Sequence, residues 1–407
     1  MKVFKFGGAS IKDSEAVKNI ATVIRKCSDA PLLIVVSAMA KNTNLLEEII
    51  ALKLKGLDYK PLLQDFEAFH DKMCSELFSN PLRIQEKIKS FLTRLKKSLS
   101  YDLEERQLYD AVVIYGELLS STIVAEYIEG SVWLDAREYI KTDNHHQNAY
   151  IDWIEIKLRV TAKLKNFTKT VVTQGFIGSD SAGNSTTLGR EGSDFSAAIF
   201  ATCLDAESVT VWIDVPGILN GAPKRVQNTQ KFYQLPYKEA AEMTYYGASV
   251  IHPKTIKPLA NNNIPLLVRS FTDLEQEGTI IHECDFKPLP TVIIKDNQCL
   301  ISFKVLDYSF INEHNLSVIF RELALADLQI NIMQNSAVSF SIVDGIVEKL
   351  RDDFQIRYNS GLRLLTIKNY TQDLIKKYQK GNKILLEQTS RNNYRSLMTP
   401  SQDNFWL

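Results

Sequence analysis

Short apolar runs that alternate with helical patterns constrain the fold of this chain most strongly. Leu32–Val36 is wholly apolar and has the length of a strand, and Val209–Ile213 is nearly so. A strand without polar alternation is typical of a parallel sheet covered on both faces. Between such runs, apolar residues recur at helical spacing, as in Val17–Cys27 after a candidate cap at Asp13, and Pro61–Leu99 predicts one long helical stretch. The alternation predicts a doubly wound α/β domain.

Charge and cysteine content exclude several classes of protein. The 407 residues include 48 Lys and Arg against 48 Asp and Glu, whereas nucleic-acid-binding and membrane-surface proteins usually carry a basic excess. We therefore expect neither a nucleic-acid nor a membrane partner. The five cysteines are far apart, which favours reduced thiols over disulfides or a zinc site. With no apolar run of membrane-spanning length and no signal-peptide pattern, the sequence predicts a soluble cytoplasmic protein.

A change in composition near Pro288–Pro290 predicts a domain boundary. Residues 1–287 are expected to form the larger α/β domain, since a chain of this length usually contains two or three domains. Residues 291–398 are expected to form a smaller region of strands and helices, either as one split unit or as two short ones. Residues 399–407 are mostly polar and predict a loose tail.

Polar and glycine-rich segments follow the first two predicted strands. At Lys5–Gly8 the backbone N–H groups of two glycines can approach phosphates, and the ammonium of Lys5 can reach a transferred phosphoryl group. An ordinary tight turn with a solvated lysine explains the same residues equally well. Ser37–Asn44 follows the next strand, where open α/β sheets bind ligands, although its hydroxyl and amide side chains are also common helix caps.

Two further motifs place charged residues in apolar or glycine-rich surroundings. Glu117 lies in an apolar helical block, so it either faces water or has a cationic partner, which is a substrate ammonium or a basic residue of the fold. The predicted loop Gly175–Ser193 contains several glycines and ends at a helix start. Within it, Arg190 can bind a carboxylate through two hydrogen bonds. Ser193 or Asp194 can bind a ligand there or simply cap the helix.

Two later residues allow more than one interpretation. Asp214 follows the strand Val209–Ile213, where it can act on Mg²⁺ indirectly, hydrogen-bond a nucleotide or only set a Pro-Gly turn. His252 precedes Pro253. Because no nearby residue resembles a nucleophile that needs a base, we expect a structural role for this histidine.

Taken in order, these motifs resemble the aspartate kinase family of the amino-acid kinase superfamily. The resemblance covers nearly all of residues 1–285 and rests on Lys-Phe-Gly-Gly, Val-Ser-Ala-Met, Gly-Glu-x-Leu-Ser-Ser, Gln-Gly-Phe-Ile-Gly, Thr-Thr-Leu-Gly-Arg and Gly-Ser-Asp. It implies an α/β fold, a three-layer αβα sandwich with a mostly parallel central sheet, followed by a smaller α+β, ACT-like regulatory region. It also implies phosphorylation of the β-carboxylate of L-aspartate by ATP with Mg²⁺, the first step towards lysine, threonine and methionine. A carboxylate is already a nucleophile, so such a reaction needs no general base.

The resemblance also assigns roles to individual residues. Lys5 and Asp194 are the expected catalytic residues. The expected substrate-binding residues are Thr43, Glu117, Arg190 and Ser193, with Glu117 on the ammonium and Arg190 on the α-carboxylate. The expected ATP-binding residues are Lys5, Gly7, Gly8, Ile213, Asp214, Leu219, Lys224, Ser249 and Val250. Asn331, Gln334 and Ser336 are candidates for binding a lysine or threonine effector, a homodimer through the C-terminal region is implied, and no metal ligand is assigned to the protein itself.

The sequence departs from the common family pattern mainly around the nucleotide site. The unusual residues are Ala9, Glu191, Ile213, Leu219, Ala222, Lys224 and Ser249, with Glu191 replacing a common glycine. Because the predicted catalytic and substrate-binding residues are intact, we expect weaker or differently arranged ATP binding rather than lost catalysis. Two alternatives stay open: an amino-acid sensor whose ATP site has decayed, and a superfamily relative that phosphorylates another acid.

Overall fold

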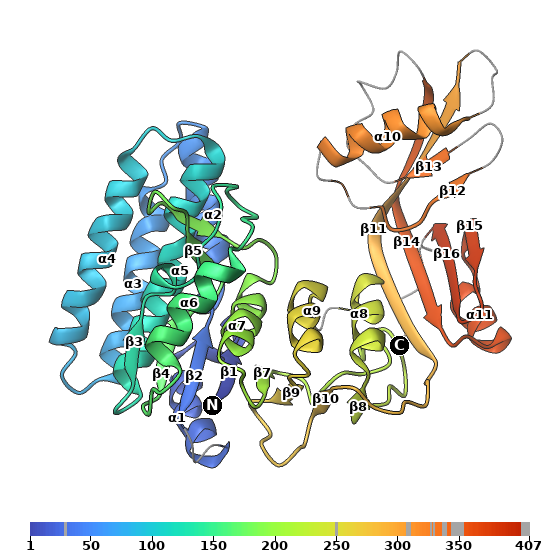
Figure 1. The fold of residues 1–407 in the computed structure, drawn as a ribbon. Coiled ribbons are helices and arrows are strands. Elements are labelled where there is room, and N and C mark those ends of the chain that lie inside the picture. Colours follow the sequence, from blue (N-terminus) through green and yellow to red (C-terminus); the bar gives the residue numbers. More distant parts are fainter. Residues whose placement is uncertain are drawn as a thin grey trace. The chain divides into compact units, whose positions relative to one another are not determined.

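The structure is a computed structural model in which two compact units are described (Figure 1). It describes residues 1–27, 31–248, 251–306, 311–325, 328, 330–335, 340–342 and 354–399. The first unit comprises Met1–Ile218, Lys231–Thr244 and Ser249–Phe286, and the second comprises Leu219–Gln230, Tyr245–Ala248 and Lys287–Leu407. Two short segments inside the predicted 1–287 domain therefore belong to the second unit.

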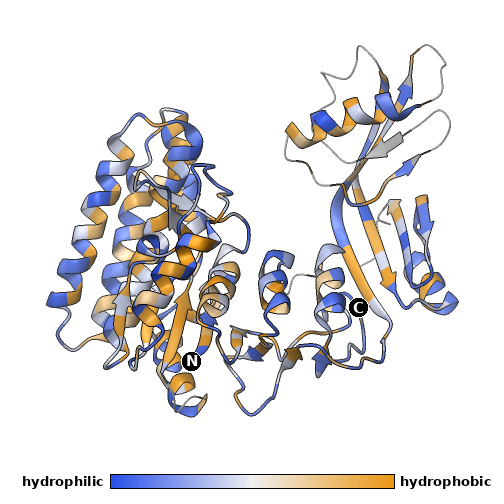
Figure 2. Ribbon diagram, viewed as in Figure 1, coloured by the Kyte–Doolittle hydropathy of each residue, from blue (hydrophilic) through white to orange (hydrophobic). Residues whose placement is uncertain are grey.

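An eight-stranded sheet forms the centre of the first unit. In spatial order its strands are β3 (Val132–Leu134), β4 (Val171–Gln174), β2 (Leu32–Val36), β1 (Lys2–Phe6), β7 (Val209–Ile213), β9 (Leu266–Ser270), β10 (Thr279–Ile281) and β8 (Gln234–Leu235). Neighbouring strands are parallel except for β9 and β10. Every residue of β2 is buried, and Figure 2 shows the apolar residues of β1 and β2 in the middle of the unit. The apolar run thus forms the covered parallel strand that its composition predicts.

Helices cover both faces of this sheet. On one face lies α5 (Glu105–Tyr127) with α1 (Ser14–Cys27), α2 (Asn42–Leu54), α3 (Lys60–Leu77) and α4 (Leu82–Ser100). On the other lies α7 (Gly192–Cys203) with α6 (Trp153–Leu164) and α9 (Pro253–Asn261). The two groups belong to crossovers that run in opposite directions along the sheet, and right-handed crossovers of opposite direction lie on opposite faces. The predicted three-layer αβα sandwich is confirmed.

The helices and loops of the first unit differ from the prediction in two places and agree with it at one helix cap. The single helical stretch predicted over Pro61–Leu99 is wrong, because Phe78 is extended after α3 and Pro81 precedes α4. The loop predicted over Gly175–Ser193 contains a hairpin of β5 (Ile177–Ser179) and β6 (Ser185–Thr187). The predicted cap is confirmed, since Asp13 Oδ1 accepts a hydrogen bond of 2.8 Å from the N–H of Ala16 in α1. The remaining short elements of this region are η1 (Gly8–Ile11), η2 (Ala136–Glu138) and α8 (Tyr237–Tyr245).

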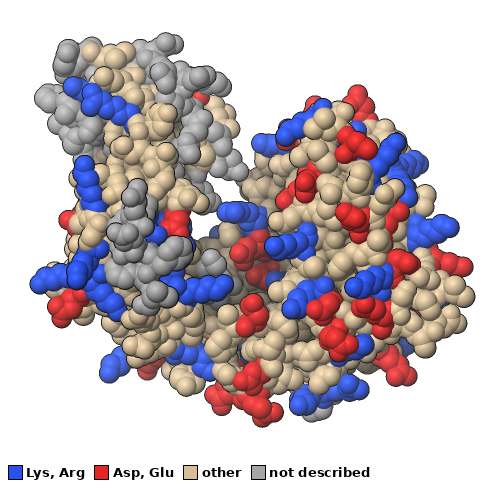
Figure 3. Space-filling view, turned by 180° about the vertical axis from the view of Figure 1, so that it is seen from behind, with Lys and Arg blue, Asp and Glu red and all other residues tan. Residues whose placement is uncertain are grey.

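The surface of the described residues matches the balanced charge of the sequence. On the face shown in Figure 3, basic and acidic side chains are interspersed over the first unit without a large patch of one sign. Among the described helices, α5 is long and apolar enough to cross a membrane, but 83% of its most apolar window is buried. Its apolar residues are used for packing inside the fold.

The second unit is built on an antiparallel sheet of six strands. Their order is β12 (Gln334–Asn335), β13 (Phe340–Ile342), β11 (Thr291–Val305), β14 (Phe354–Lys368), β16 (Asn393–Thr399) and β15 (Lys383–Thr389). One core, which includes Phe303 and Phe354, packs against α10 (Glu313–Leu325). Another, which includes Ile367, packs against α11 (Gln372–Gln379). The predicted smaller α+β region is confirmed, with two helix-covered halves that share the long strands β11 and β14.

Two details differ from the predicted domain bounds: the end of the chain, and the segment Leu219–Gln230. Thr399 belongs to β16, so the predicted loose tail does not begin there, and residues 400–407 lie outside the described residues.

The segment Leu219–Gln230 is held by the second unit, because Val226 is 7% exposed in the core around Ile367. Arg225 and Arg363 also form ion pairs with the carboxylate of Asp296.

Candidate active site

The carboxyl ends of four neighbouring strands bring the predicted site residues to one edge of the sheet. Phe6 in β1 pairs with Val36 in β2 and with Trp212 in β7, and Val36 pairs with Gln174 in β4. The segments that start at Gly7, Ser37, Gly175 and Asp214 therefore leave the sheet at the same edge. Open α/β sheets bind their ligands at this edge, where the crossovers diverge to opposite faces.

A cavity of about 470 Å³ lies at this edge. The four predicted substrate-binding residues, Thr43, Glu117, Arg190 and Ser193, all line it. The other lining residues are Ser37, Glu47, Tyr109, Gln147, Phe176, Gly189, Glu191 and Gly192. Glu47 and Tyr109 are not among the residues predicted from the motifs, although helical spacing indicates them. Glu47 lies one helical turn after Thr43, and Tyr109 lies about two turns before Glu117.

Glu117 is a buried carboxylate that lacks a cationic partner among the described residues. Its side chain is on α5, the residue is 3% exposed, and Oε1 accepts one hydrogen bond of 3.3 Å from the N–H of Ala38. Oε2 has no hydrogen-bond partner in the described structure. Burial raises the pKa of Glu117 to about 8. No basic side chain of the described residues pairs with Glu117, so the ammonium of a ligand in the cavity would supply the missing cationic partner.

Lys5 and Asp194 form a close ion pair beside this cavity. Lys5 Nζ lies 2.5 Å from Asp194 Oδ1, and the two side chains are 12% and 6% exposed. Neither Ser193 nor Asp194 caps α7, whose N-cap is Glu191 without a side-chain cap. The capping interpretation of Ser193 and Asp194 is therefore wrong. Asp194 instead holds the ammonium of Lys5 at the carboxyl end of β1.

The glycines of the motifs allow backbone segments to approach closely. A Cβ on Gly8 would lie 2.8 Å from the carbonyl oxygens of Ala38 and Ala40, so the first two strand-end loops pack directly against each other. A Cβ on Gly175 would lie 2.5 Å from Cβ of Ser193. In the loop after β2, no side chain caps α2, whose N-cap is Lys41. The capping interpretation of that loop is also wrong, and Thr43 lines the cavity instead.

Glu191 is unusual in both its backbone and its side chain. Its φ is 54°, in the left-handed region that favours glycine. Burial and the charge of Asp194 raise the pKa of Glu191, whereas Lys5 and Arg190 lower it. The chain thus places an extra carboxyl group next to the Lys5–Asp194 pair.

Replacing Glu191 with glycine is expected to stabilise the protein by about 1 kcal/mol, because the left-handed backbone is then unstrained. It is also expected to lower KM for ATP several-fold, since the resemblance places phosphates beside Lys5, where a negative charge is then removed. Thermal unfolding and initial rates measure the two effects. Asp205→Gly is the matched control, because Asp205 follows the opposite end of α7 with φ 47°. An unchanged KM for ATP in Glu191→Gly would contradict the electrostatic part.

The remaining predicted nucleotide residues are placed only in part. Ile213 ends β7 and Asp214 is exposed directly after it. Leu219 and Lys224 belong to the segment held by the second unit. Ser249 and Val250 lie outside the described residues. The structural role expected for His252 is confirmed, because its Nδ1 accepts a hydrogen bond of 3.1 Å from the N–H of Lys254 and caps α9.

The candidate effector residues lie in the second unit. Asn331 is half-buried, and its side chain accepts a hydrogen bond of 2.7 Å from Lys295 and donates one of 2.9 Å to Gln298. Gln334 is exposed in β12. Ser336 lies outside the described residues. Asn331 therefore forms a polar cluster with Lys295 and Gln298 of β11, and Gln334 is accessible from solvent.

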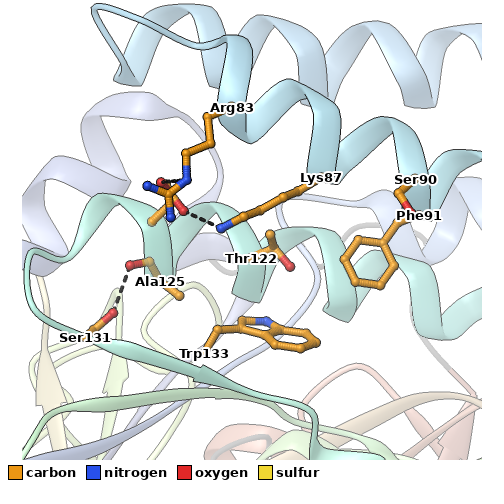
Figure 4. Close-up of a pocket in the computed structure, with 9 residues that line it drawn as sticks. Arg83, Lys87, Ser90, Phe91, Thr122, Ala125, Ser131 and Trp133 are labelled. Carbon is orange, nitrogen blue, oxygen red and sulfur yellow. Dashed lines mark hydrogen bonds and ion pairs between the residues drawn. The ribbon is translucent and has the colours of Figure 1, made fainter.

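A second cavity, of about 440 Å³, lies between α4, α5 and β3 (Figure 4). Phe91 and Trp133 form an apolar part of its wall. The basic groups of Arg83 and Lys87 both point to Glu126, at 3.6 and 2.7 Å. The charges of this cavity are thus compensated within the protein, and it contains none of the predicted site residues.

In the part of the chain that the structure describes, the protein has no dedicated metal-binding site. No group of three or more His, Cys, Asp or Glu residues there is arranged to hold a metal ion. A divalent ion that accompanies nucleotide phosphates needs few protein ligands, because it keeps several waters and phosphate oxygens.

Comparison with known proteins defines the class of this chain. It belongs to the amino acid kinase family, whose model matches residues 1–270. The lysine-sensitive aspartokinase 3 of Escherichia coli (strain K12) is 32% identical over 355 residues, which cover 84% of this chain and 77% of that protein. The chain also matches a bifunctional aspartokinase/homoserine dehydrogenase of Arabidopsis thaliana, at 32% identity over 69% of this chain, but spans only 32% of that protein.

Solved structures give the same result at the level of the fold. E. coli aspartokinase III in complex with aspartate and ADP superimposes with a TM-score of 0.84 at 26% identity, covering 98% of this chain and 96% of that one. The same enzyme in complex with lysine and aspartate gives a TM-score of 0.79 at 27% identity, covering 100% and 97%. The resemblance to aspartate kinases that the motifs indicate is confirmed.

Proposed function

We propose that this protein is an aspartate kinase, which transfers the γ-phosphoryl group of ATP to the β-carboxylate of L-aspartate and forms 4-phospho-L-aspartate. The observation that carries the proposal is the unpaired, buried carboxylate oxygen of Glu117 in a cavity that Arg190 also lines. A buried anion and a guanidinium complement the ammonium and α-carboxylate of an α-amino acid. The aspartokinase relatives support aspartate as that amino acid.

The four predicted substrate-binding residues each have a role in holding the amino acid. Glu117 accepts hydrogen bonds from the ammonium, and the planar guanidinium of Arg190 binds the α-carboxylate through two parallel hydrogen bonds. The hydroxyl groups of Thr43 and Ser193 hydrogen-bond the remaining carboxylate oxygens. Holding both ends of the amino acid orients the β-carboxylate for attack on phosphorus, which supplies much of the rate enhancement in such reactions.

Lys5 and Asp194 act on the transferred group. The ammonium of Lys5 neutralises charge on the phosphoryl oxygens in the transition state, and Asp194 keeps that ammonium at the end of β1. The proposed ATP-binding residues are Lys5, Gly7, Gly8, Ile213, Asp214, Leu219, Lys224, Ser249 and Val250. Mg²⁺ arrives with ATP and neutralises its phosphates. Because Leu219 and Lys224 replace common family residues, ATP binding is weaker than is typical of the family.

Trapping of the acyl phosphate tests the proposed function directly. The purified protein is incubated with MgATP, hydroxylamine and either L-aspartate or L-glutamate, and the hydroxamate is measured. We expect product from aspartate and little from glutamate. Product from glutamate alone would favour the relative that acts on another acid. Absence of product from both acids, in protein that still binds aspartate, would favour the amino-acid sensor.

We further propose that the second unit binds a regulatory amino acid, in particular lysine. The relative from E. coli is named lysine-sensitive, and the candidate residues Asn331, Gln334 and Ser336 follow α10 in the second unit. In the trapping assay, saturating lysine is expected to lower the rate several-fold, whereas threonine serves as the alternative effector. Constant rates in both amino acids would remove feedback regulation from the proposal.

The assembly and location complete the proposal. A homodimer that forms through the second unit is expected, and the protein is expected to work in the cytoplasm, where its substrates are made. Light scattering coupled to gel filtration distinguishes a dimer from a monomer of 46.2 kDa.

A further inference from the structure

A fully buried carboxylate on α5 lies outside the roles described so far. Asp110 is 0% exposed, and it lies two helical turns before Glu117 on the same face of the helix. Its Oδ1 accepts a hydrogen bond of 2.6 Å from the hydroxyl of Thr187, and its Oδ2 lies 2.8 Å from Nδ1 of His146. The backbone N–H of Gln147 donates to both oxygens at 3.2 Å. Three segments therefore meet at one carboxylate.

The loop bound by Asp110 forms part of the wall of the substrate cavity. Gln147 lines the cavity, and its φ of 70° is in the left-handed region, which a residue other than glycine adopts only when its surroundings hold it there. The N–H of Ala149 also donates to the carbonyl of Thr187 at 2.9 Å. The loop is thus fastened to β6 on one side and to α5 on the other.

Gln147 is also adjacent to the turn that presents Arg190. A Cβ on Gly189 would lie 2.7 Å from Oδ1 of Asn148 and 3.4 Å from the carbonyl oxygen of Gln147. The loop and the Gly189–Arg190 turn are therefore in direct contact. Arg190 and Gln147 thus line the same cavity from two segments that touch.

We propose that Gln147 binds the substrate's α-carboxylate together with Arg190, and that Asp110 is a positioning residue that holds Gln147 in place. The proposal rests on the proposed function, because it needs an α-amino acid in the cavity. The carboxamide N–H₂ of Gln147 donates to the second lone pair of a carboxylate oxygen that the guanidinium also binds. Asp110 does not touch the substrate. It acts by fixing the backbone of Gln147 through the hydrogen bonds to its N–H and to His146.

Binding of L-aspartate to the full chain, measured by calorimetry without ATP, tests the proposal. Gln147→Gly removes the carboxamide and leaves the left-handed backbone unstrained, so the protein stays folded. We expect Kd for aspartate to rise about 10-fold, since a hydrogen bond to a charged group contributes about that factor. Asp110→Asn replaces one accepting oxygen by a donor, and is expected to raise Kd by a similar factor.

The double variant separates positioning from a general structural effect. If Asp110 acts through Gln147, then Asp110→Asn adds little to Kd in the Gln147→Gly background. KM for ATP is expected to stay unchanged in both single variants. Thr142→Val is the matched control, because it removes a neighbouring buried hydrogen bond of 2.7 Å to Thr186 without touching Gln147. It is expected to lower thermal stability and leave Kd for aspartate unchanged.

Clear results would overturn the inference without affecting the proposed function. A Kd for aspartate within twofold of the wild type in Gln147→Gly would remove the contact with the carboxylate. Fully multiplicative effects in the double variant, or an equal rise in Kd in Thr142→Val, would reduce Asp110 to a structural residue. Wild-type protein that binds aspartate but forms no acyl phosphate would contradict the proposed function alone, and the binding comparison would still decide the inference.

Discussion

Replacing Lys5 with methionine is expected to lower kcat by about 10³-fold, because the transition state loses a fixed positive charge in a buried site. The ion pair with Asp194 places this charge at the carboxyl end of β1, next to the cavity. KM for aspartate is expected to change little, since Lys5 does not line the cavity proposed to bind the amino acid. Initial rates in the hydroxylamine assay, at saturating ATP and aspartate, measure the effect.

A loss of activity by unfolding has to be separated from a loss of catalysis. Lys5→Met leaves Asp194 buried without its partner, and such a change costs about 3–5 kcal/mol of stability. The double variant Lys5→Met/Asp194→Asn removes both charges, so its melting temperature is expected to recover while kcat stays low. Lys2→Met in the same strand, which removes only a surface pair with Glu207, serves as the control. Recovery of kcat in the double variant would refute the catalytic role of Lys5.

Replacing Glu117 with glutamine is expected to raise KM for aspartate on the order of 100-fold, because the substrate ammonium loses a buried charged partner. Glutamine has the same shape, so the cavity keeps its size and the helix its packing. Glu126→Gln is the matched control on the same helix, where the carboxylate forms a surface pair with Lys87. A KM for aspartate within threefold of the wild type in Glu117→Gln would exclude Glu117 as the ammonium ligand.

The pKa of Glu117 gives this prediction a pH dependence. In the protein without substrate, burial raises this pKa from 4.5 to about 8, and only the ionised form binds an ammonium well. KM for aspartate is therefore expected to fall as the pH rises from 6.5 to about 8.5, with release of a proton on binding. Glu117→Gln is expected to lack this dependence. An identical pH profile in both proteins would contradict the assignment.

The raised pKa of Glu117 also makes the stability of the folded protein depend on pH. A carboxyl group whose pKa is higher in the folded protein than in the unfolded chain favours folding at low pH. This contribution is lost as the pH rises from the unfolded pKa to the folded pKa. Without aspartate, the melting temperature is thus expected to fall between about pH 5 and pH 8 more steeply in the wild type than in Glu117→Gln. Addition of aspartate is expected to reduce the difference.

Most of the fold could be predicted because it depends on local patterns. The apolar run Leu32–Val36 is the buried parallel strand β2, and Asp13 caps α1. The break between α3 and α4 and the hairpin of β5 and β6 were missed. Pro81 marks the break between α3 and α4 in the sequence itself, whereas the composition of the other region suits a loop and packing against the rest of the unit forms its hairpin.

The sequence motifs identified those residues of the site whose chemistry is evident from the residue type. Lys5, Glu117 and Arg190 stand out because charged residues in apolar or glycine-rich surroundings need a reason. Gln147 and Asp110 did not stand out. A glutamine in a polar loop and an aspartate near a helix start look ordinary in a sequence, and their importance depends on which other segments they meet.

The amino-acid order alone determines the α/β class, the family and the candidate charged residues, because strand runs, glycine turns and charges are properties of short segments. The tertiary structure alone decides three further matters. It shows that Asp194 pairs with Lys5 rather than capping a helix, that Glu117 has no cationic partner among the described residues, and that Leu219–Gln230 belongs to the second unit. Burial and pairing are relations between distant segments, and only folding sets the distances on which those interactions depend.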